Sequence, residues 1–356
     1  MNVKEIRILQ EELSSIIGVS GHEEDVAKYI LKLIKKKEGL ADKAWIDPLG
    51  NVLAIIEGKE EKNRILFDAH MDEVGFMISH VEDNGFLRFV LIGSWDVRIL
   101  AGQCVKIRSS NGKILDGIIG SKPPHLSSQA ERKKIIEVSE MYIDIGMGSI
   151  EEVQEAGIEV GSTGTLHTPF VEFPNNMVKG KAFDDRTGCN VLIQLMRILK
   201  EKKNLKETIM FNFAVQEEIG GRGAITGAYT LEPTMAIAIE NTTAGDVPGM
   251  KKSEIPVYIG KGPAITVADK SIISSPMVNK RLIKNAIKVG IPYQIKKPLY
   301  GGTDAGKIHI SRSGVPSTVV SVPCRYIHSP TCLLNLNDII NTVKLLEVFI
   351  ENPAKK

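Results

Sequence analysis

Four short apolar runs in this chain each lead into a carboxylate or a histidine, and this pattern constrains the fold more than any other feature. The clearest run, residues 210–215, is short enough for a buried strand and is followed closely by the adjacent acids Glu217 and Glu218. Burying a charge is costly unless it is paired or coordinated, so two acids at a strand end indicate a nearby cation. The other runs are residues 65–67 before His70 and Asp72, 235–239 before Glu240, and 318–322 before His328.

The segments around these runs predict an α/β fold. Apolar residues at helical spacing predict helices over residues 3–16, 26–34, 186–202, 277–289 and 337–350. We expect Ser20 and Glu23 to form a capping box before the second helix, and Gly290 to end the fourth. Open α/β sheets place their active sites at the carboxyl edge of the strands. The histidines and acids that follow the apolar runs are therefore expected to meet at that edge.

Residues 73–167 have a different sequence pattern. Short strand-like runs over residues 75–81, 85–92, 103–107 and 113–119 are separated by turns such as Asp-Asn-Gly. This pattern predicts a small barrel or antiparallel sheet and not βαβ units. We therefore expect a domain formed by residues 1–72 and 168–356, interrupted by an inserted β domain at 73–167.

Composition excludes several classes of protein. The formal net charge is +2 and the basic runs have acids nearby, so we expect no nucleic-acid partner. No run approaches the roughly 18 apolar residues that span a bilayer, and the N-terminus lacks the apolar core of a signal peptide. The four cysteines are widely spaced, which is typical of a reduced compartment. We expect a cytoplasmic protein without a membrane partner.

The histidines and acids indicate a metal centre more strongly together than singly. His70 and Asp72 are two residues apart in an extended segment, so their side chains point the same way and Asp72 can orient the imidazole. A lone histidine is more often a core or surface residue, and this pair alone is weak. Asp184 and Asp185 precede a predicted helix, where one can cap the helix while the other points into the cleft.

Two histidines and at least three acids are about what two metal ions with a shared carboxylate require. Mixed nitrogen and oxygen ligation suits Zn²⁺, our first expectation, or Co²⁺ or Mn²⁺, and the absence of thiolates argues against a closed structural zinc site. Glu217 and Glu218 face differently, so one can bind metal while the other acts as a base. Water on the metal, deprotonated by that glutamate, could attack an amide carbonyl.

Five motifs in order resemble those of metallopeptidase family 42, which contains tetrahedral, deblocking and glutamyl aminopeptidases, some with a historical endoglucanase or cellulase label. The motifs are HMDEVG at 70–75, FDDRTG at 183–188, QEEIG at 216–220, GGTDAG at 301–306 and RYIHSP at 325–330. The resemblance covers the whole chain. It implies a mixed-sheet α/β/α dinuclear metallopeptidase domain with an inserted PDZ-like β-barrel involved in dimerisation, and a homo-oligomer that is often a dodecamer.

The resemblance also implies roles for single residues. Asp184 would bridge two metal ions, with His70 and Glu240 completing one site and Glu218 and His328 the other. Glu217 would be the general base, and Asp72 would orient His70. Thr303 and Asp304 would lie near the substrate, where Asp304 could hold its N-terminal amine. The family pattern usually has Asp at position 240; Glu240 is a departure with a longer side chain, and Asp246 is a less favoured substitute.

The leading hypothesis is a metal-dependent aminopeptidase that removes N-terminal residues from short peptides. A glycoside hydrolase would use two carboxylates but would leave His70 and His328 without a role. A non-catalytic, metal-stabilised assembly protein would have no use for an uncoordinated carboxylate. The sequence does not predict the preferred N-terminal residue.

Overall fold

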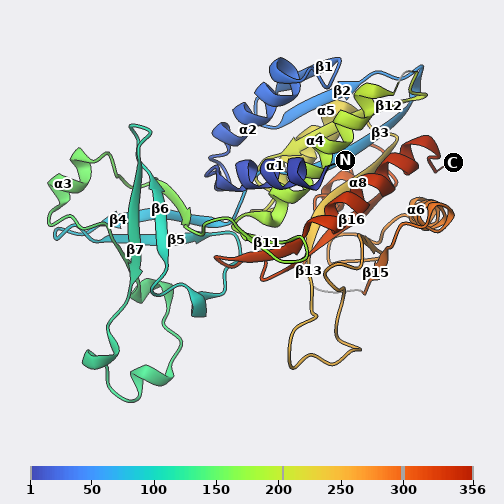
Figure 1. The fold of residues 1–356 in the computed structure, drawn as a ribbon. Helices are drawn as coiled ribbons and strands as arrows, with labels where there is room; N and C mark the ends of the chain where they lie inside the picture. Colours follow the sequence, from blue (N-terminus) through green and yellow to red (C-terminus); the bar gives the residue numbers. More distant parts are fainter. Residues whose placement is uncertain (1, 203, 298–300, 355–356) are drawn as a thin grey trace.

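The protein is described by a computed structural model that covers residues 2–202, 204–297 and 301–354. An open mixed sheet with helices on both faces forms one part, and a closed β-barrel, inserted in the chain between strands β3 and β10, forms the other (Figure 1). The α/β class and the inserted barrel are as predicted.

Eleven strands of the described chain form the large sheet. Nine follow the order β1-β2-β12-β3-β13-β16-β17-β11-β10, and β14 pairs with both β16 and β15. The central strands β12, β3, β13 and β16 run parallel, so their carboxyl ends share one edge. The bounds are β1 Lys43–Ile46, β2 Val52–Ile56, β3 Glu60–His70, β10 Val171–Phe173, β11 Met177–Gly180, β12 Glu207–Ala214, β13 Met235–Thr243, β14 Ala264–Thr266, β15 Gln294–Lys296, β16 Ser317–Arg325 and β17 Cys332–Asn335.

The central strands contain short apolar runs, such as residues 65–67 of β3, because both faces of the sheet are covered there. In β3, Phe67 packs into the larger core under α1, α2, α4, α6 and α8, whereas its neighbour Leu66 packs into a smaller core with α5 and α7. Phe211 and Met210 alternate in the same way in β12. This two-sided burial explains why the runs are continuous and do not alternate with polar residues.

The predicted long helices are all present. Gly290 ends α6 with a left-handed backbone, as expected, because glycine adopts this conformation without a steric penalty. No helix among the described residues has both the length and the hydropathy of a membrane span. The bounds are α1 Val3–Ser15, α2 Glu24–Leu31 with a π-helical extension Lys32–Lys37, α3 Ile150–Glu155, α4 Phe183–Glu201, α5 Arg222–Leu231, α6 Pro276–Val289, α7 Ala305–Ile308 and α8 Leu336–Glu351.

The inserted barrel closes in the order β4-β5-β8-β7-β6-β9 around its own apolar core, which includes Phe76, Phe89 and Ile107. Closure removes the exposed edges of the sheet. Its strands are β4 Gly75–Val81, β5 Leu87–Ile92, β6 Cys104–Arg108, β7 Ile114–Gly120, β8 Tyr142–Asp144 and β9 Thr163–Leu166, with short 3-10 helices at Val97–Ile99, Pro124–Leu126, Glu131–Lys133 and Val138–Glu140.

The predicted capping box at Ser20 and Glu23 is wrong. Helix α2 begins at Glu24, and the Glu23 side chain makes no capping bond to it. The Ser20 hydroxyl instead donates to Asp72 (2.6 Å), and Glu23 accepts from the backbone N–H of Gln216 (3.0 Å). Long-range partners have therefore displaced the local interaction that the spacing suggested.

The expected end of the third apolar run is also wrong. Strand β13 continues through Glu240 to Thr243, because its pairing with β16 extends that far. Its pairing with β3 stops earlier, at Ala238 opposite Asp68. Beyond this point β3 no longer pairs with β13, and Glu240 Oε2 lies 3.8 Å from Nε2 of His70, the last residue of β3.

Candidate metal centre

The carboxyl edge of the parallel strands brings the predicted ligands together. His70 is the last residue of β3, Glu218 follows β12, Glu240 lies in β13, and His328 lies in the loop between β16 and β17. Asp184 lies at the start of α4, where its backbone is not helical. Segments separated by up to 258 residues in the chain, His70 to His328, thus contribute to one cluster.

One potential ligand group consists of His70, Asp184 and Glu240, whose ligand atoms all lie within 4.8 Å of one another. His70 Nε2 is 3.5 Å from Asp184 Oδ1 and 3.8 Å from Glu240 Oε2. His70 is 1% exposed and Glu240 4%, so this group lies at the buried end of the cluster.

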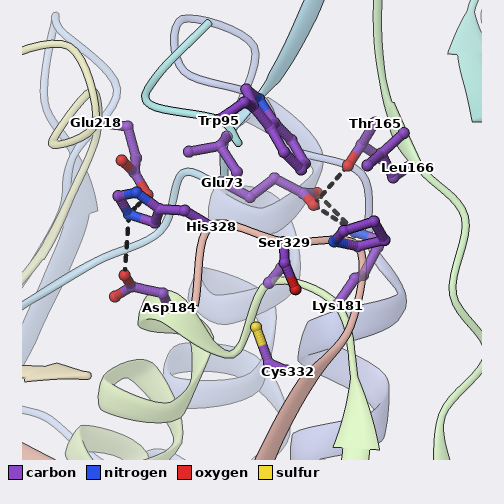
Figure 2. A pocket seen from close by; sticks show the side chains of 13 residues that line it. Glu73, Trp95, Thr165, Leu166, Lys181, Asp184, Glu218, His328, Ser329 and Cys332 are labelled. Atoms are coloured by element: carbon purple, nitrogen blue, oxygen red, sulfur yellow. Dashed lines mark hydrogen bonds and ion pairs between the residues drawn. The ribbon is translucent and has the colours of Figure 1, made fainter. Parts of the chain in front are cut away.

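A second potential group consists of Asp184, Glu218 and His328. His328 Nε2 is 3.3 Å from Asp184 Oδ2 and 3.2 Å from Glu218 Oε1 (Figure 2). Asp184 therefore directs one oxygen to each histidine. A third combination consists of His70, Glu217 and Glu218, whose ligand atoms also lie within 4.8 Å of one another. Glu217 Oε2 is 4.0 Å from His70 Nε2.

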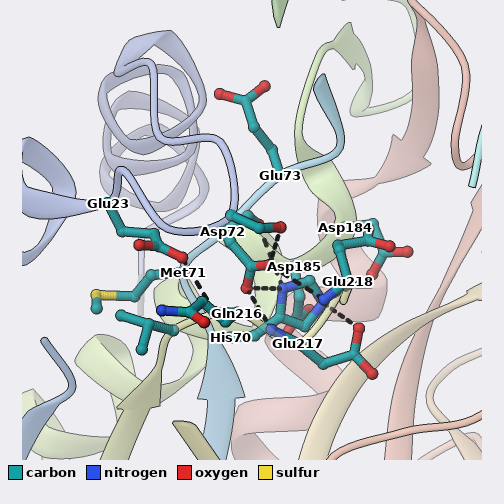
Figure 3. Close-up of polar contacts among 12 residues, drawn as sticks. Glu23, His70, Met71, Asp72, Glu73, Asp184, Asp185, Gln216, Glu217 and Glu218 are labelled. Carbon is teal, nitrogen blue, oxygen red and sulfur yellow. Dashed lines mark hydrogen bonds and ion pairs between the residues drawn. The ribbon is translucent and has the colours of Figure 1, made fainter. Parts of the chain in front are cut away.

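Asp72 contacts both the His70 ring and the turn that contains Glu217 and Glu218. Its Oδ1 is 3.3 Å from His70 Nδ1, and its two oxygens accept from the backbone N–H groups of Glu217 (2.9 Å) and Glu218 (3.1 Å) (Figure 3). Although burial acts to raise the pKa of Asp72, hydrogen bonds from His70 and Ser20 are among the contacts that hold it below its usual range. A carboxylate that fixes the orientation of a histidine ring is a common support for a metal ligand.

Charge in the cluster is poorly balanced without cations. Burial raises the pKa of Glu217 to about 8, and it raises the pKa of Glu240 well above its usual range. Burial alone would lower the pKa of His328, but Asp184 and Glu218 raise it to about 11, and Asp184 and Asp72 raise that of His70 in the same way. The metal-free cluster therefore retains protons on groups that would be metal ligands.

The donor set fits divalent metal ions. It combines imidazole nitrogen with carboxylate oxygen, and no cysteine belongs to any of the three groups found in the described chain. The buried Glu218 Oε1 has no hydrogen-bond donor of acceptable geometry, although such an atom normally has a partner. A cation between Glu218, Asp184 and His328 would satisfy it.

Metal affinity is expected to rise with pH. His70 and His328 have raised pKa values and must lose their protons to bind a cation, so each proton released makes the affinity rise about tenfold per pH unit. Titration calorimetry of the chelator-treated protein with Zn²⁺ between pH 6 and 8, in buffers of different ionisation enthalpy, should reveal this release. Binding with the same affinity and no proton release across that range would contradict it.

Thr303 and Asp304 lie behind this cluster. The backbone N–H of Asp304 donates to Glu240 Oε1 (3.0 Å), and the Thr303 hydroxyl donates to Asp269 (3.0 Å). The Asp304 side chain is fully buried beside Asp68, with which it can share a hydrogen bond when one of the two acids is protonated. The alternative acid Asp246 forms an ion pair with Arg325 (2.7 Å) and belongs to none of the ligand groups.

Asp184 and Asp185 have the two different roles predicted from their position: one interacts with the backbone of the helix, and the other points toward the metal ligands. Asp185 accepts from the backbone N–H of Gly188 (3.0 Å) inside α4, whereas Asp184 faces the histidines. Burial raises the pKa of Asp185 well above its usual range.

The sequence did not predict a buried network of polar contacts around Glu73, between the barrel and the sheet. Glu73 accepts from Lys181 Nζ (2.6 Å), from the Thr165 hydroxyl (2.9 Å) and from the backbone N–H of Gly18 (3.1 Å) (Figure 2). These contacts join the barrel, the loop after α1 and the start of α4 beside His328. The only sequence signal was that Glu73 follows His70 and Asp72.

Known proteins with similar sequences and structures share this arrangement of the chain. The family model described as M42 glutamyl aminopeptidase matches residues 50–345. The lysyl aminopeptidase of Pyrococcus furiosus is 32% identical over 350 residues, covering 96% of each chain. The glutamyl aminopeptidase of Lactococcus lactis is 30% identical over 341 residues, covering 95% of this chain and 94% of the relative.

Two solved structures share the whole fold. The TET aminopeptidase of a Thaumarchaeota archaeon has a TM-score of 0.95 at 38% identity, covering 99% of this chain and 98% of its own. The Pyrococcus horikoshii TET1 peptidase, which can assemble into a tetrahedron or a large octahedral shell, has a TM-score of 0.85 at 34% identity, covering 97% and 99%. This chain therefore belongs to the M42 glutamyl aminopeptidase family and is an aminopeptidase, a hydrolase that acts on peptide bonds.

Proposed function

We propose that this aminopeptidase removes N-terminal residues from short peptides and uses two divalent metal ions that share Asp184. The observation that supports this most directly is the division of Asp184 between the two histidines, with Oδ1 near His70 and Oδ2 near His328. His70 and Glu240 would complete one site, and Glu218 and His328 the other. Zn²⁺ is the ion we expect first, and Co²⁺ or Mn²⁺ also suit this donor set.

When bound, the ions would supply Lewis acidity, which lowers the pKa of water and polarises the scissile carbonyl. Glu217 is the proposed general base. Its carboxylate lies beside both ligand groups, and its pKa of about 8 is close to the range in which proton transfer at neutral pH is efficient. Glu217 would take a proton from the attacking water and deliver it to the leaving amine nitrogen. Asp72 would keep the His70 ring and the turn at Glu217 in place.

Thr303 and Asp304 are proposed to shape the substrate end of the site through Glu240. The supporting contact is the hydrogen bond from the Asp304 N–H to Glu240, since the Asp304 carboxylate is fully buried. Direct contact between Asp304 and the substrate amine stays a prediction.

We also propose that the protein is a cytoplasmic homo-oligomer in which the inserted domain, residues 73–167, forms the dimer contact, with a dodecamer as the candidate assembly. The inserted domain exposes Val90 (50%), Ile118 (53%) and Leu126 (71%), and exposed apolar side chains that form a patch are common at protein interfaces. The P. horikoshii relative can assemble into a tetrahedron or a large octahedral shell. The four free cysteines suit a reduced compartment.

Neither alternative function has an observation of its own in its favour. A glycoside hydrolase needs two carboxylates and no imidazole, whereas two histidines lie among the acids here. A metal site with only a structural role would not need Glu217 beside it.

Chelation and metal restoration test the proposal. Treating the enzyme with a chelator should abolish hydrolysis of aminoacyl p-nitroanilides, and adding Zn²⁺, Co²⁺ or Mn²⁺ should restore it, because the ions supply the Lewis acid. Hydrolysis of a cellulose substrate that survives the chelator would support the glycosidase alternative. A correctly folded, metal-loaded protein that hydrolyses no aminoacyl amide and no short peptide would contradict the proposal.

A further inference from the structure

Asp269 lies in the loop between β14 and α6, and it also contacts the loop that precedes α7. Its Oδ1 accepts from the backbone N–H of Ser271 (2.7 Å), from the Ser271 hydroxyl (2.7 Å) and from the backbone N–H of Ile272 (3.0 Å). Its Oδ2 accepts from the Thr303 hydroxyl (3.0 Å). This half-buried carboxylate therefore organises its own loop with one oxygen and holds the neighbouring loop with the other.

Thr303 is held at two points. In addition to the hydrogen bond from its hydroxyl to Asp269, its backbone N–H donates to the Ser271 hydroxyl oxygen (3.1 Å). Ser271 also packs directly on the start of α7, because a Cβ placed on Gly306 would lie only 2.3 Å from Ser271 Cβ. The contacts of Asp269 and Ser271 together fix the backbone at Thr303.

The residue after Thr303 contacts the candidate metal centre. The backbone N–H of Asp304 donates to Glu240 Oε1 (3.0 Å). The other oxygen, Glu240 Oε2, lies 3.8 Å from His70 Nε2, which places it on the side of the metal ligands. A glutamate side chain is long and flexible, so ordering it costs conformational entropy. The hydrogen bond from Asp304 holds one oxygen in place and leaves the other directed toward His70.

We propose that Asp269 is a positioning residue that orients the metal ligand Glu240. It acts through Ser271 and Thr303, and then through the backbone N–H of Asp304. In this arrangement Glu240 contacts its ion with Oε2 alone, because Oε1 accepts from Asp304. Asp269 therefore raises the metal affinity of the ligand group that contains Glu240 and leaves that of the other group unchanged. The inference rests on the proposed function, which assigns one ion to each group.

The connection between Asp269 and the ligand is short and does not pass through another ligand. It consists of the hydrogen bond from Thr303 to Asp269, one peptide link, and the hydrogen bond from Asp304 to Glu240. Asp269 belongs to none of the ligand groups found in the described chain, so replacing it leaves every ligand present. Groups that orient a ligand in this way typically change metal affinity by about 10- to 100-fold when they are lost. A purely structural clamp would instead lower the stability of the loops without favouring one metal site.

Metal binding by Asp269→Ala tests the proposal. Calorimetric titration of the chelator-treated variant with Zn²⁺ should show one of two binding events weakened by about tenfold and the other unchanged. Anomalous diffraction at limiting Zn²⁺ identifies the weakened site, because the peak beside Glu240 should lose occupancy and the peak beside His328 should not. Thr303→Val removes the hydroxyl and should weaken the same site, whereas Thr303→Ser retains the hydroxyl and should bind as the wild type does.

Asp144→Ala is the matched control. Asp144 also accepts from the backbone N–H two residues further on, that of Gly146 (2.8 Å), but it is exposed at the end of β8 in the barrel. Its loss should leave both Zn²⁺ affinities unchanged. A double-mutant cycle then separates positioning from a general loosening of the fold. In a Glu240→Ala background, Asp269→Ala should weaken metal binding no further, because its effect passes through the Glu240 side chain. Thermal unfolding of each variant establishes that it is folded.

Three results would overturn the assignment. They are unchanged affinity at both sites in folded Asp269→Ala, an equal loss of affinity at both sites, and a wild-type crystal in which both Glu240 oxygens contact the ion. If Asp269→Ala does not fold, Ser271→Ala provides a second measurement, because it removes the hydroxyl that joins Asp269 to the Thr303 N–H. A wild-type chain that binds one Zn²⁺ or none would instead refute the proposed function and would be recognised as such.

Discussion

Replacing Glu217 with glutamine should lower kcat by about 10²- to 10⁴-fold, the usual contribution of a general acid–base group. Glutamine has nearly the same shape but cannot take a proton from water. The ligand groups His70–Asp184–Glu240 and Asp184–Glu218–His328 do not include this side chain, so both ions should stay bound. The hydrogen bond from the backbone N–H at position 217 to Asp72 is also retained, because it does not involve the side chain.

Steady-state kinetics with a good chromogenic substrate and metal analysis of the same preparation measure the two effects separately. Glu254→Gln is the control, since Glu254 is an exposed glutamate in a different part of the structure. Loss of metal together with activity would make Glu217 a ligand and not the base. Activity close to that of the wild type would exclude it from the chemistry.

Asp184→Asn should be more damaging, because it weakens both proposed metal sites with one change. An amide oxygen is a poorer ligand than a carboxylate, and the nitrogen cannot serve as a second ligand atom. Activity at stoichiometric metal should fall by about 10³-fold or more, equivalent to several kcal/mol of lost Lewis-acid stabilisation. Metal content should fall below that of the wild type after gel filtration.

Asp185→Asn is a closely matched control for this change. Asp185 is the adjacent acid, and it accepts a hydrogen bond from Gly188 that an asparagine oxygen can also accept. Its raised pKa favours the neutral form, which asparagine resembles. We therefore expect Asp185→Asn to retain metal. Equal loss of metal in both variants would indicate that the damage comes from this turn and not from a shared ligand.

The parts of the site that were predicted correctly are those that depend on short, contiguous stretches of sequence. The runs before His70 and Glu218 were recognisable because a stretch of strand buried on both faces is mainly apolar, as residues 65–67 of β3 and most of β12 are. Their parallel pairing then places His70 beside Ala214, at the edge where the acidic turn begins. The five motifs that resemble family 42 assigned roles to the ligands, which spacing alone left open.

The predictions that were wrong depended on contacts between distant segments. The spacing of Ser20 and Glu23 fits a capping box, but Asp72 and the backbone N–H of Gln216 are hydrogen-bond partners that only the folded chain brings close. Gln216 has a left-handed backbone, with φ of 57°, which a non-glycine residue rarely adopts. The backbone N–H groups of residues 216–218 donate to the carboxylates of Glu23 and Asp72, and these bonds hold the turn in this conformation. The segment whose role was wrongly predicted therefore supports the turn that carries Glu217.

The burial of Lys296 was not recognisable from the sequence for a different reason. This residue stands beside Lys297 in a short polar run, where both lysines would ordinarily be assigned to the surface. Burial of the first and exposure of the second follow from the alternation of side chains at the end of β15. The position of β15 next to β14, which connects it to β16, is a tertiary feature that no local pattern indicates.

Anomalous diffraction from crystals grown with Zn²⁺ is the most direct test of a shared aspartate between two cations. We expect two peaks per chain, about 3.5–4 Å apart as in other two-metal sites, with one Asp184 oxygen directed to each. His70 and Glu240 should contact one peak, and Glu218 and His328 the other. A single peak at full metal loading, or two peaks that Asp184 does not join, would contradict this account of the site.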